Sequence, residues 1–285
     1  MRVKRASKYG FCAGVRVADL KVRRFTSDGG SGAILGALVH NERVVREFED
    51  LGMRTVDDLA EVDETTVVFS AHGVPASYHE YAHKLGLEVL DTTCTYVDDI
   101  HDEVRLALAE GCHIVVVGDP AHREVVGYTA DLEPADFHVI SSLKDAVAVD
   151  WRVYPKIKII YQTTLNAADF EEVVVEIERR NPHTVRADTI CYATKENQDA
   201  VRELASDPEV DVILVIGGKS SANSRHLWEI ASRRKPSHLI QGIEDIRDEW
   251  LNDVSCVGLT AGASTPDSAI DEVEAFLESQ AKSKE

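Results

Sequence analysis

The sequence predicts an α/β fold made of three similar units, each with a small parallel sheet. Three segments share one pattern, in which a cysteine opens a helical stretch of mixed polarity and an apolar run follows about twenty residues later. The runs AILGALV, IVVVG and VILVIGG are short, continuous and rich in valine and isoleucine. Strands that are buried on both faces of a parallel sheet have this composition, so each segment indicates a βαβ unit.

Polar loops follow the three runs in a nearly constant register. His40 and His122 each lie 28 residues after the cysteine that opens their segment, and Ser220 lies 29 residues after its own. In parallel sheets, ligands bind beyond the carboxyl ends of the strands, which is where these loops begin. We therefore expect the three loops to contribute to one binding site.

A second predicted strand and its loop follow in each segment, at 67–75, 159–169 and 256–267. Each loop leads into a helix, after which a further strand delivers the next cysteine. The first cysteine follows the N-terminal residues instead, so the start of the chain must complete the third unit and close a pseudo-threefold ring. The predicted unit boundaries are 1–93, 94–190 and 191–285.

The chain has five cysteines, and its N-terminus lacks the apolar core of an export signal, so a disulfide framework is not expected. The sequence contains no Cys-X-X-Cys pair. Cys112 and Cys256 stand at strand starts in apolar surroundings and are interpreted as core residues. Cys12, Cys94 and Cys191 head equivalent units, so we expect their sulfur atoms to meet at the axis of the ring.

Three converging thiolates can hold a mononuclear zinc ion or an iron–sulfur cluster, because soft sulfur ligands suit both. A cubane cluster has four irons, so three cysteines leave one iron without a protein ligand. Such an iron can act as a Lewis acid toward a substrate oxygen, much as a catalytic metal keeps one position open. The cysteine pattern thus allows catalysis as well as electron transfer.

The loops supply hydrogen-bond donors of the kind that bind phosphate or diphosphate. One histidine after a strand is at least as often a surface residue, but several in register with the cysteines favour a ligand. Glu124 is a candidate proton donor, with Thr163 or Thr164 passing the proton or holding a water. Alternatively, Glu124 is only a negative charge at a helix N-terminus, where the helix dipole favours it. The expected donors are His40, His72, His122, Ser221, Asn223 and Ser264.

Composition excludes several classes of function. The chain has 50 acidic and 31 basic residues among 285, a net charge of −19, whereas proteins that bind nucleic acids display basic faces. No stretch approaches the roughly 20 apolar residues that a membrane span needs. We expect a cytoplasmic protein that binds neither nucleic acid nor membrane, and that captures any anionic substrate at a local site.

The chain resembles the 4-hydroxy-3-methylbut-2-enyl diphosphate reductase family (IspH/LytB) from GFCAGV at 10–15 to TAGASTPD at 260–267. Between these ends, the resemblance is carried by the separate motifs VHNERVV, FSAHGV, DTTC, HREVVG, QTTL, DTICYAT and SSANS. It implies a three-lobed α/β fold around a 4Fe–4S cluster with one open iron, held by Cys12, Cys94 and Cys191.

The resemblance also implies a reaction in the methylerythritol phosphate route to isoprenoids. In the family, the substrate hydroxyl leaves as water after two electrons and protons arrive, and isopentenyl and dimethylallyl diphosphates form. A ferredoxin- or flavodoxin-like protein is the implied electron donor. Glu124 would deliver protons and Thr163 would position the hydroxyl or a water. The implied substrate-binding residues are His40, His72, His122, Thr164, Ser221, Asn223 and Ser264.

Several residues depart from the family pattern. Tyr9, Thr95 and Ala222 stand where arginine, proline and serine are common, and Lys195 and Glu196 change the stretch after the third cysteine. Loss of one serine donor costs on the order of 1 kcal/mol of binding. Two alternatives therefore stand beside the reductase: a paralogous cluster-dependent reductase or dehydratase acting on a different substrate, and a non-catalytic metal-binding or redox-sensing protein.

Overall fold

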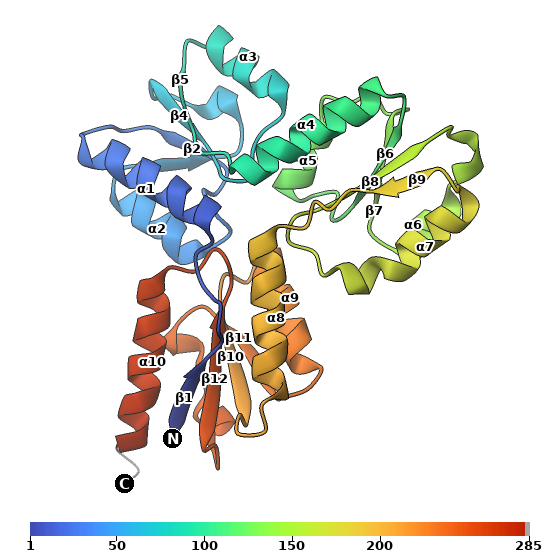
Figure 1. Ribbon diagram of the computed structural model, residues 1–285. Helices are drawn as coiled ribbons and strands as arrows, with labels where there is room; N and C mark the ends of the chain where they lie inside the picture. The colour runs from blue at the N-terminus through green and yellow to red at the C-terminus, as the bar shows by residue number, and fades with distance from the viewer. Residues whose placement is uncertain (283–285) are drawn as a thin grey trace. The chain divides into compact units, whose positions relative to one another are not determined.

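The computed structural model describes residues 1–282, and the strands in this part of the chain form three sheets of four strands (Figure 1). Every pairing within these sheets is parallel, which confirms the predicted fold class. By its internal contacts the chain divides into two bodies, which are described separately. Body 1 comprises Met1–Arg16, Val39–Leu51 and the residues from Tyr192 onward, and body 2 comprises Val17–Leu38 and Gly52–Cys191. The three-unit boundaries stay a prediction.

Body 1 contains one sheet with the strand order β1-β12-β10-β11. Because β1 pairs with β12, the start of the chain lies in the sheet formed by the third segment. Its strands are β1 (Arg2–Arg5), β10 (Val212–Ile216), β11 (Ser237–Ile240) and β12 (Cys256–Ala261). Its helices are α2 (Glu42–Asp50), α8 (Tyr192–Ser206), α9 (Ala222–Ser232) and α10 (Asp267–Lys282), with short 3-10 turns at Ile243–Asp245 and Asp248–Leu251.

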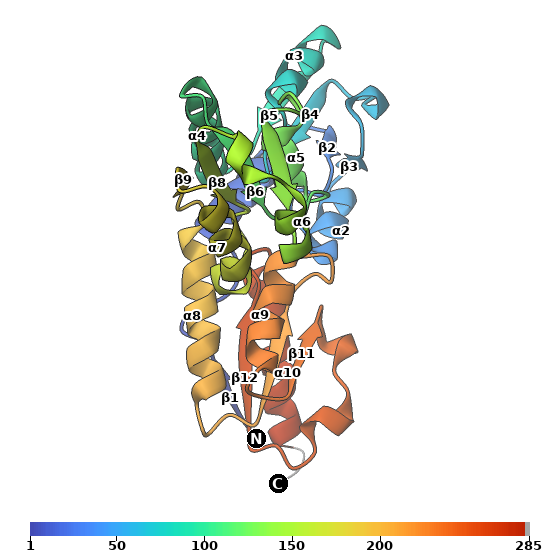
Figure 2. The ribbon, with the colours of Figure 1, turned by 90° about the vertical axis from the view of Figure 1, so that its right-hand side faces the viewer.

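Strand β10 is buried on both faces, as its continuous apolar sequence predicts. Ile213 and Val215 pack with the apolar side chains of α8 and α9, whereas Leu214 and Ile216 pack with those of α10. The alternation follows from the two-residue period of a strand. Accordingly, α10 lies on one side of the sheet, and α8 and α9 lie on the other (Figures 1 and 2).

Body 2 contains two sheets, with the orders β3-β2-β4-β5 and β7-β6-β8-β9. The first consists of β2 (Ala33–Leu35), β3 (Arg54–Val56), β4 (Thr66–Phe69) and β5 (Glu88–Asp91), and the second of β6 (His113–Val117), β7 (Phe137–Ile140), β8 (Ile157–Tyr161) and β9 (Thr184–Arg186). The helices are α3 (Ala76–Lys84), α4 (Thr95–Ala109), α5 (Arg123–Thr129), α6 (Leu143–Ala148) and α7 (Glu171–Arg180), and α1 (Ala13–Ser27) spans the boundary with body 1. Short 3-10 turns occur at Leu59–Glu61, Trp151–Val153 and Ala167–Phe170.

In each sheet the two central strands are largely buried, and polar loops follow the carboxyl ends of the strands. In body 2, β2, β4 and β6 are buried along their whole length. The parallel arrangement brings the carboxyl ends of neighbouring strands to one edge, so the loops after them lie together within each sheet. Of the helices in residues 1–282, none combines the length and the apolar character needed to cross a membrane.

Candidate functional site

Each of the three cysteines predicted as ligands is fixed by the same backbone contact. The cysteine N–H donates to the carbonyl two positions after a strand of the same body, and a helix begins at the next residue. The bonds run from Cys12 to Ala263 after β12 (3.2 Å), from Cys94 to Ala71 after β4 (3.2 Å) and from Cys191 to Thr163 after β8 (3.0 Å). The repeated contact shows that the three cysteines hold equivalent positions, one for each sheet.

All five cysteines lie in the described residues as thiols, outside any disulfide. Cys12, Cys94 and Cys191 are half-buried, whereas Cys256 is buried in the core of body 1. Cys112 packs at the border of an apolar cluster in body 2. Within residues 1–282, no group of three histidine, cysteine or acidic side chains has metal-binding geometry.

Glu124 is enclosed in body 2 by three donors. Its carboxylate accepts hydrogen bonds from the N–H of Thr163 (2.7 Å), the hydroxyl of Thr163 (2.6 Å) and the hydroxyl of Tyr128 (3.0 Å). Glu124 is 2% exposed, and this burial raises its pKa, while the hydrogen bonds oppose the rise. A buried carboxyl group of raised pKa holds its proton closer to neutral pH, as a general acid must.

The loop after β8 connects this carboxylate to a cysteine. Thr163 binds Glu124 through its N–H and hydroxyl, and its carbonyl accepts the N–H of Cys191. The next residue, Thr164, accepts a hydrogen bond from the side-chain amide of Gln162 (3.0 Å). The structure thus brings Glu124, Thr163 and the backbone of Cys191 into one connected chain of contacts.

Two of the predicted histidines meet in body 2. The rings of His72 and His122 lie edge to face with centroids 5.8 Å apart. Nδ1 of His122 accepts the backbone N–H of Glu124 (3.3 Å) and caps α5. This bond assigns the proton of the neutral ring to Nε2, which leaves that atom a donor. Nδ1 of His72 lies 3.2 Å from the hydroxyl of Ser70.

The remaining predicted residues lie in body 1. The Ser264 hydroxyl donates to the carbonyl of His40 (3.2 Å). The carbonyl of the preceding residue, Ala263, accepts the N–H of Cys12. Ser221 caps α9 by accepting the N–H of Ser224 (3.3 Å). Body 1 therefore brings Cys12, His40 and Ser264 together.

In body 1, the side-chain amide of Asn223 is the group that points most directly to a ligand. It is 4% exposed, and neither its amide oxygen nor its amide nitrogen has a hydrogen-bond partner among the described residues. A buried amide without partners is costly and rare in folded proteins. Such a group is explained when a polar ligand completes its hydrogen bonds.

Sequence reasoning missed two residues that complete these arrangements. Tyr128 was not singled out, although it stands four residues after Glu124, and this spacing places both on one face of a helix. Glu42 was also missed. It follows His40 by two residues, as Glu124 follows His122, and it binds side chains of two other loops.

A sequence model of the LytB protein family matches residues 3–278, almost the whole chain. The chain belongs to the LytB family. A LytB relative from Acidithiobacillus ferrooxidans, named 4-hydroxy-3-methylbut-2-enyl diphosphate reductase, is 38% identical over 278 residues, which are 96% of this chain and 87% of the relative. A relative of the same name from an Anaeromyxobacter strain is 39% identical, with 97% of each chain covered.

A solved structure agrees with these sequence relatives. It is described as the E-1-hydroxy-2-methyl-but-2-enyl-4-diphosphate reductase of Plasmodium falciparum. It is 27% identical and superposes with a TM-score of 0.89 over 97% of this chain and 87% of the other. The likeness therefore extends over nearly the whole chain and includes residues of both bodies that carry the predicted site residues.

Proposed function

We propose that this LytB-family chain removes the hydroxyl group of 4-hydroxy-3-methylbut-2-enyl diphosphate reductively, giving isopentenyl and dimethylallyl diphosphates. In this reaction the allylic carbon–oxygen bond breaks, two electrons and two protons are taken up, and the oxygen leaves as water. The observation that carries the proposal is the buried carboxyl of Glu124, held by Thr163 next to Cys191. The names of the relatives supply the substrate.

Cys12, Cys94 and Cys191 are the proposed ligands of a 4Fe–4S cluster. The donor set fits this group, since three soft thiols occur in the same backbone setting at the starts of three helices. When bound, such a cluster supplies electrons and one iron that remains open to act as a Lewis acid. A ferredoxin- or flavodoxin-like protein is the proposed source of the electrons, and the cytoplasm is the proposed location.

Glu124 is the proposed proton donor. Its carboxyl group is shielded from water, and the hydroxyl of Thr163 lies 2.6 Å from one carboxylate oxygen. This contact lets Thr163 orient a substrate hydroxyl or a water for proton transfer. Burial raises the pKa of Glu124, which favours the protonated form that the reaction consumes.

The proposed diphosphate donors are divided between the bodies. His72, His122 and Thr164 are contributed by body 2, and His40, Ser221, Asn223 and Ser264 by body 1. Neutral donors of this kind suit a phosphate group in a strongly acidic protein, because they bind the anion without a large basic surface. The unpartnered amide of Asn223 supports the assignment in body 1.

The reaction is tested by anaerobic reconstitution with iron and sulfide, followed by turnover with a strong chemical reductant. Formation of both diphosphate products supports the proposal. Tight binding of the substrate without conversion would overturn it. The cluster ligands are tested separately by iron and sulfide content, which falls in Cys94→Ser and stays unchanged in the control Cys112→Ser.

A paralogous activity on another substrate remains the second candidate, because Ala222 removes a hydroxyl that the family pattern carries in the diphosphate loop. Parallel assays with allylic alcohols that have and lack the diphosphate distinguish the two activities. Conversion that does not depend on the diphosphate would favour the paralogue.

A further inference from the structure

Glu42 uses both of its carboxylate oxygens within body 1. One oxygen accepts the hydroxyl of Ser220 at 3.1 Å, and the other accepts the side-chain amide of Gln241 at 2.6 Å. Ser220 lies in the loop between β10 and α9, and Gln241 follows β11. Glu42 itself is the first residue of α2. One half-buried side chain thus links three segments that are far apart in the sequence.

The linked segments also carry three of the four proposed diphosphate donors of body 1, His40, Ser221 and Asn223. Glu42 follows His40 by two residues, and Ser220 directly precedes Ser221, the cap of α9. Asn41 stands between His40 and Glu42 and caps α2 by accepting the N–H groups of two residues in its first turn. Glu42 therefore links the segment of His40 to the loop that carries Ser221.

Gly218 shows how closely these segments approach. A side-chain carbon at position 218 would lie 2.4 Å from the carbonyl oxygen of His40 and 2.8 Å from a carboxylate oxygen of Glu42. Both distances are too short for real contacts, so this loop can sit against His40 and Glu42 only with glycine at this position. The two segments are therefore in direct contact beside Glu42.

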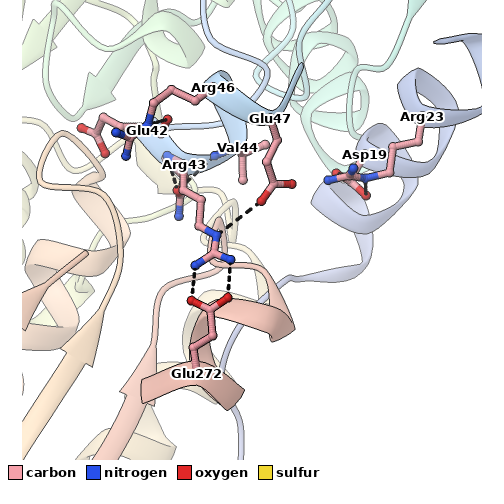
Figure 3. Close-up of polar contacts among 9 residues, drawn as sticks. Asp19, Arg23, Glu42, Arg43, Val44, Arg46, Glu47 and Glu272 are labelled. Carbon is pink, nitrogen blue, oxygen red and sulfur yellow. Dashed lines mark hydrogen bonds and ion pairs between the residues drawn. The ribbon is translucent and has the colours of Figure 1, made fainter. Parts of the chain in front are cut away.

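An ion pair from the neighbouring residue also fixes α2, as Figure 3 shows. The guanidinium of Arg43 donates to both carboxylate oxygens of Glu272 on α10, each at 2.7 Å, and also to Glu47 at 3.3 Å. Helix α10 begins three residues after Ser264, whose hydroxyl binds the carbonyl of His40. Arg43 therefore holds α2 against the helix that follows the Ser264 loop, while Glu42 holds it against the Ser221 loop.

We propose that Glu42 is a positioning residue for diphosphate binding, which keeps His40 and the Ser221–Asn223 loop at the spacing that one diphosphate group spans. The proposal deepens the proposed function and rests on it. Glu42 does not bind the anion itself, because carboxylate and diphosphate repel each other. Its carboxylate accepts a hydrogen bond from the Ser220 hydroxyl and thereby holds the loop that carries Ser221.

A positioning role and a purely electrostatic role predict opposite effects. If Glu42 acted only through its charge, its removal would tighten the binding of an anion. If Glu42 positions the donors, its removal weakens binding, because His40 and the Ser221 loop separate. The sign of the change in affinity for inorganic diphosphate therefore decides between the two roles.

The experiment measures binding of inorganic diphosphate to the cluster-loaded protein by calorimetry, together with kcat and KM for the proposed substrate. Glu42→Ala is expected to weaken diphosphate binding and raise KM by about tenfold each, as for the loss of one good hydrogen bond to a charged ligand, while kcat changes less than twofold. Glu49→Ala, an exposed position on the same helix, is the matched control and leaves both constants unchanged.

A reciprocal exchange separates positioning from general loss of structure. Gln241→Glu alone places two carboxylates together and weakens binding. Combined with Glu42→Gln, it restores one amide–carboxylate contact and returns the affinity to within about threefold of wild type, a difference of less than one neutral hydrogen bond.

Unchanged or tighter binding in Glu42→Ala, or no rescue in the double variant, would overturn the positioning role. If the wild-type protein converts the substrate and Glu42→Ala behaves normally, only this inference fails. If wild type binds diphosphate and Glu42→Ala weakens it without any conversion, the proposed function fails and the positioning role stands. Absence of diphosphate binding in wild type overturns both.

Discussion

Glu42 and Glu124 occupy the same place in two repeats and differ in their surroundings. Each follows a histidine by two residues and lies in the first turn of a helix after a central strand. Glu124 is buried among the donors of Thr163 and Tyr128, and burial raises its pKa. Glu42 is half-buried and binds two side chains of neighbouring loops.

Burial, rather than residue type or register, is what distinguishes the proposed proton donor Glu124 from the proposed positioning residue Glu42. A half-buried carboxylate such as that of Glu42 keeps contact with water and can bind its neighbours. One enclosed without a cation gains stability by keeping its proton, so it can exchange that proton with a bound molecule. We therefore expect changes in body 2 to affect turnover, and changes in body 1 to affect binding of the diphosphate.

The largest effect is expected from Glu124→Gln. The substitution preserves the size of the side chain and removes the exchangeable carboxyl proton, so kcat should fall by about 10²- to 10⁴-fold, the usual contribution of a general acid. Diphosphate affinity and iron content should be those of wild type. Turnover with a strong reductant measures the loss, and Glu133→Gln at an exposed position serves as the control. Near-normal turnover would remove Glu124 from the mechanism and favour the non-catalytic alternative.

Asn223→Ala is expected to weaken binding of the diphosphate, whereas Glu124→Gln is expected to leave that binding unchanged. Because both polar atoms of the amide lack partners in the described chain, truncation should leave the free energy of unfolding unchanged or slightly increased. Affinity for inorganic diphosphate should fall by about 10- to 100-fold, since hydrogen bonds to a charged ligand are lost. Calorimetry and thermal unfolding measure the two quantities.

Asn181 provides a matched control for that prediction. It is also buried, but its side-chain amide donates to the carbonyls of Trp151 and Tyr154 and its oxygen accepts the N–H of His183. Asn181→Ala should destabilise the protein by about 2 kcal/mol or more, because it leaves buried backbone groups unpaired, without changing diphosphate binding. A large loss of stability in Asn223→Ala would show that its amide has a structural role.

The sequence predicts the parts of this arrangement that depend on local patterns. The apolar runs identify β2, β6 and β10, and the repeat identifies the three equivalent cysteines. Contacts between distant segments leave no local pattern: Glu42 and Gln241 are 199 residues apart, and Arg43 and Glu272 are 229 apart. The raised pKa of Glu124 also depends on packing by the whole of body 2. By contrast, the contact between Tyr128 and Glu124 is predictable from their four-residue spacing on a helix.

Ala222→Ser is expected to have a smaller effect, an increase in the affinity of body 1 for diphosphate. Ala222 is the first residue of α9, between Ser221 and the buried Asn223, so a hydroxyl there adds a donor to the same loop. Affinity for inorganic diphosphate should increase about fivefold, the equivalent of roughly 1 kcal/mol. No gain in affinity would show that this loop does not contact the diphosphate through position 222, and would strengthen the case for a shifted substrate.

The smallest expected effect concerns pH. The Tyr128 hydroxyl stabilises the charged form of Glu124, so Tyr128→Phe removes a hydrogen bond that lowers the pKa of Glu124. That pKa then rises further, and the protonated form persists to higher pH. If protonated Glu124 is required, the alkaline fall of kcat moves to higher pH by about half a unit to one unit, as expected for a bond worth roughly 1 kcal/mol. Tyr78→Phe, away from the carboxylate, should leave the profile in place. If the reaction instead needs the carboxylate, the alkaline fall stays in place and the rise of kcat on the acid side moves to higher pH, which would make Glu124 a base rather than a proton donor.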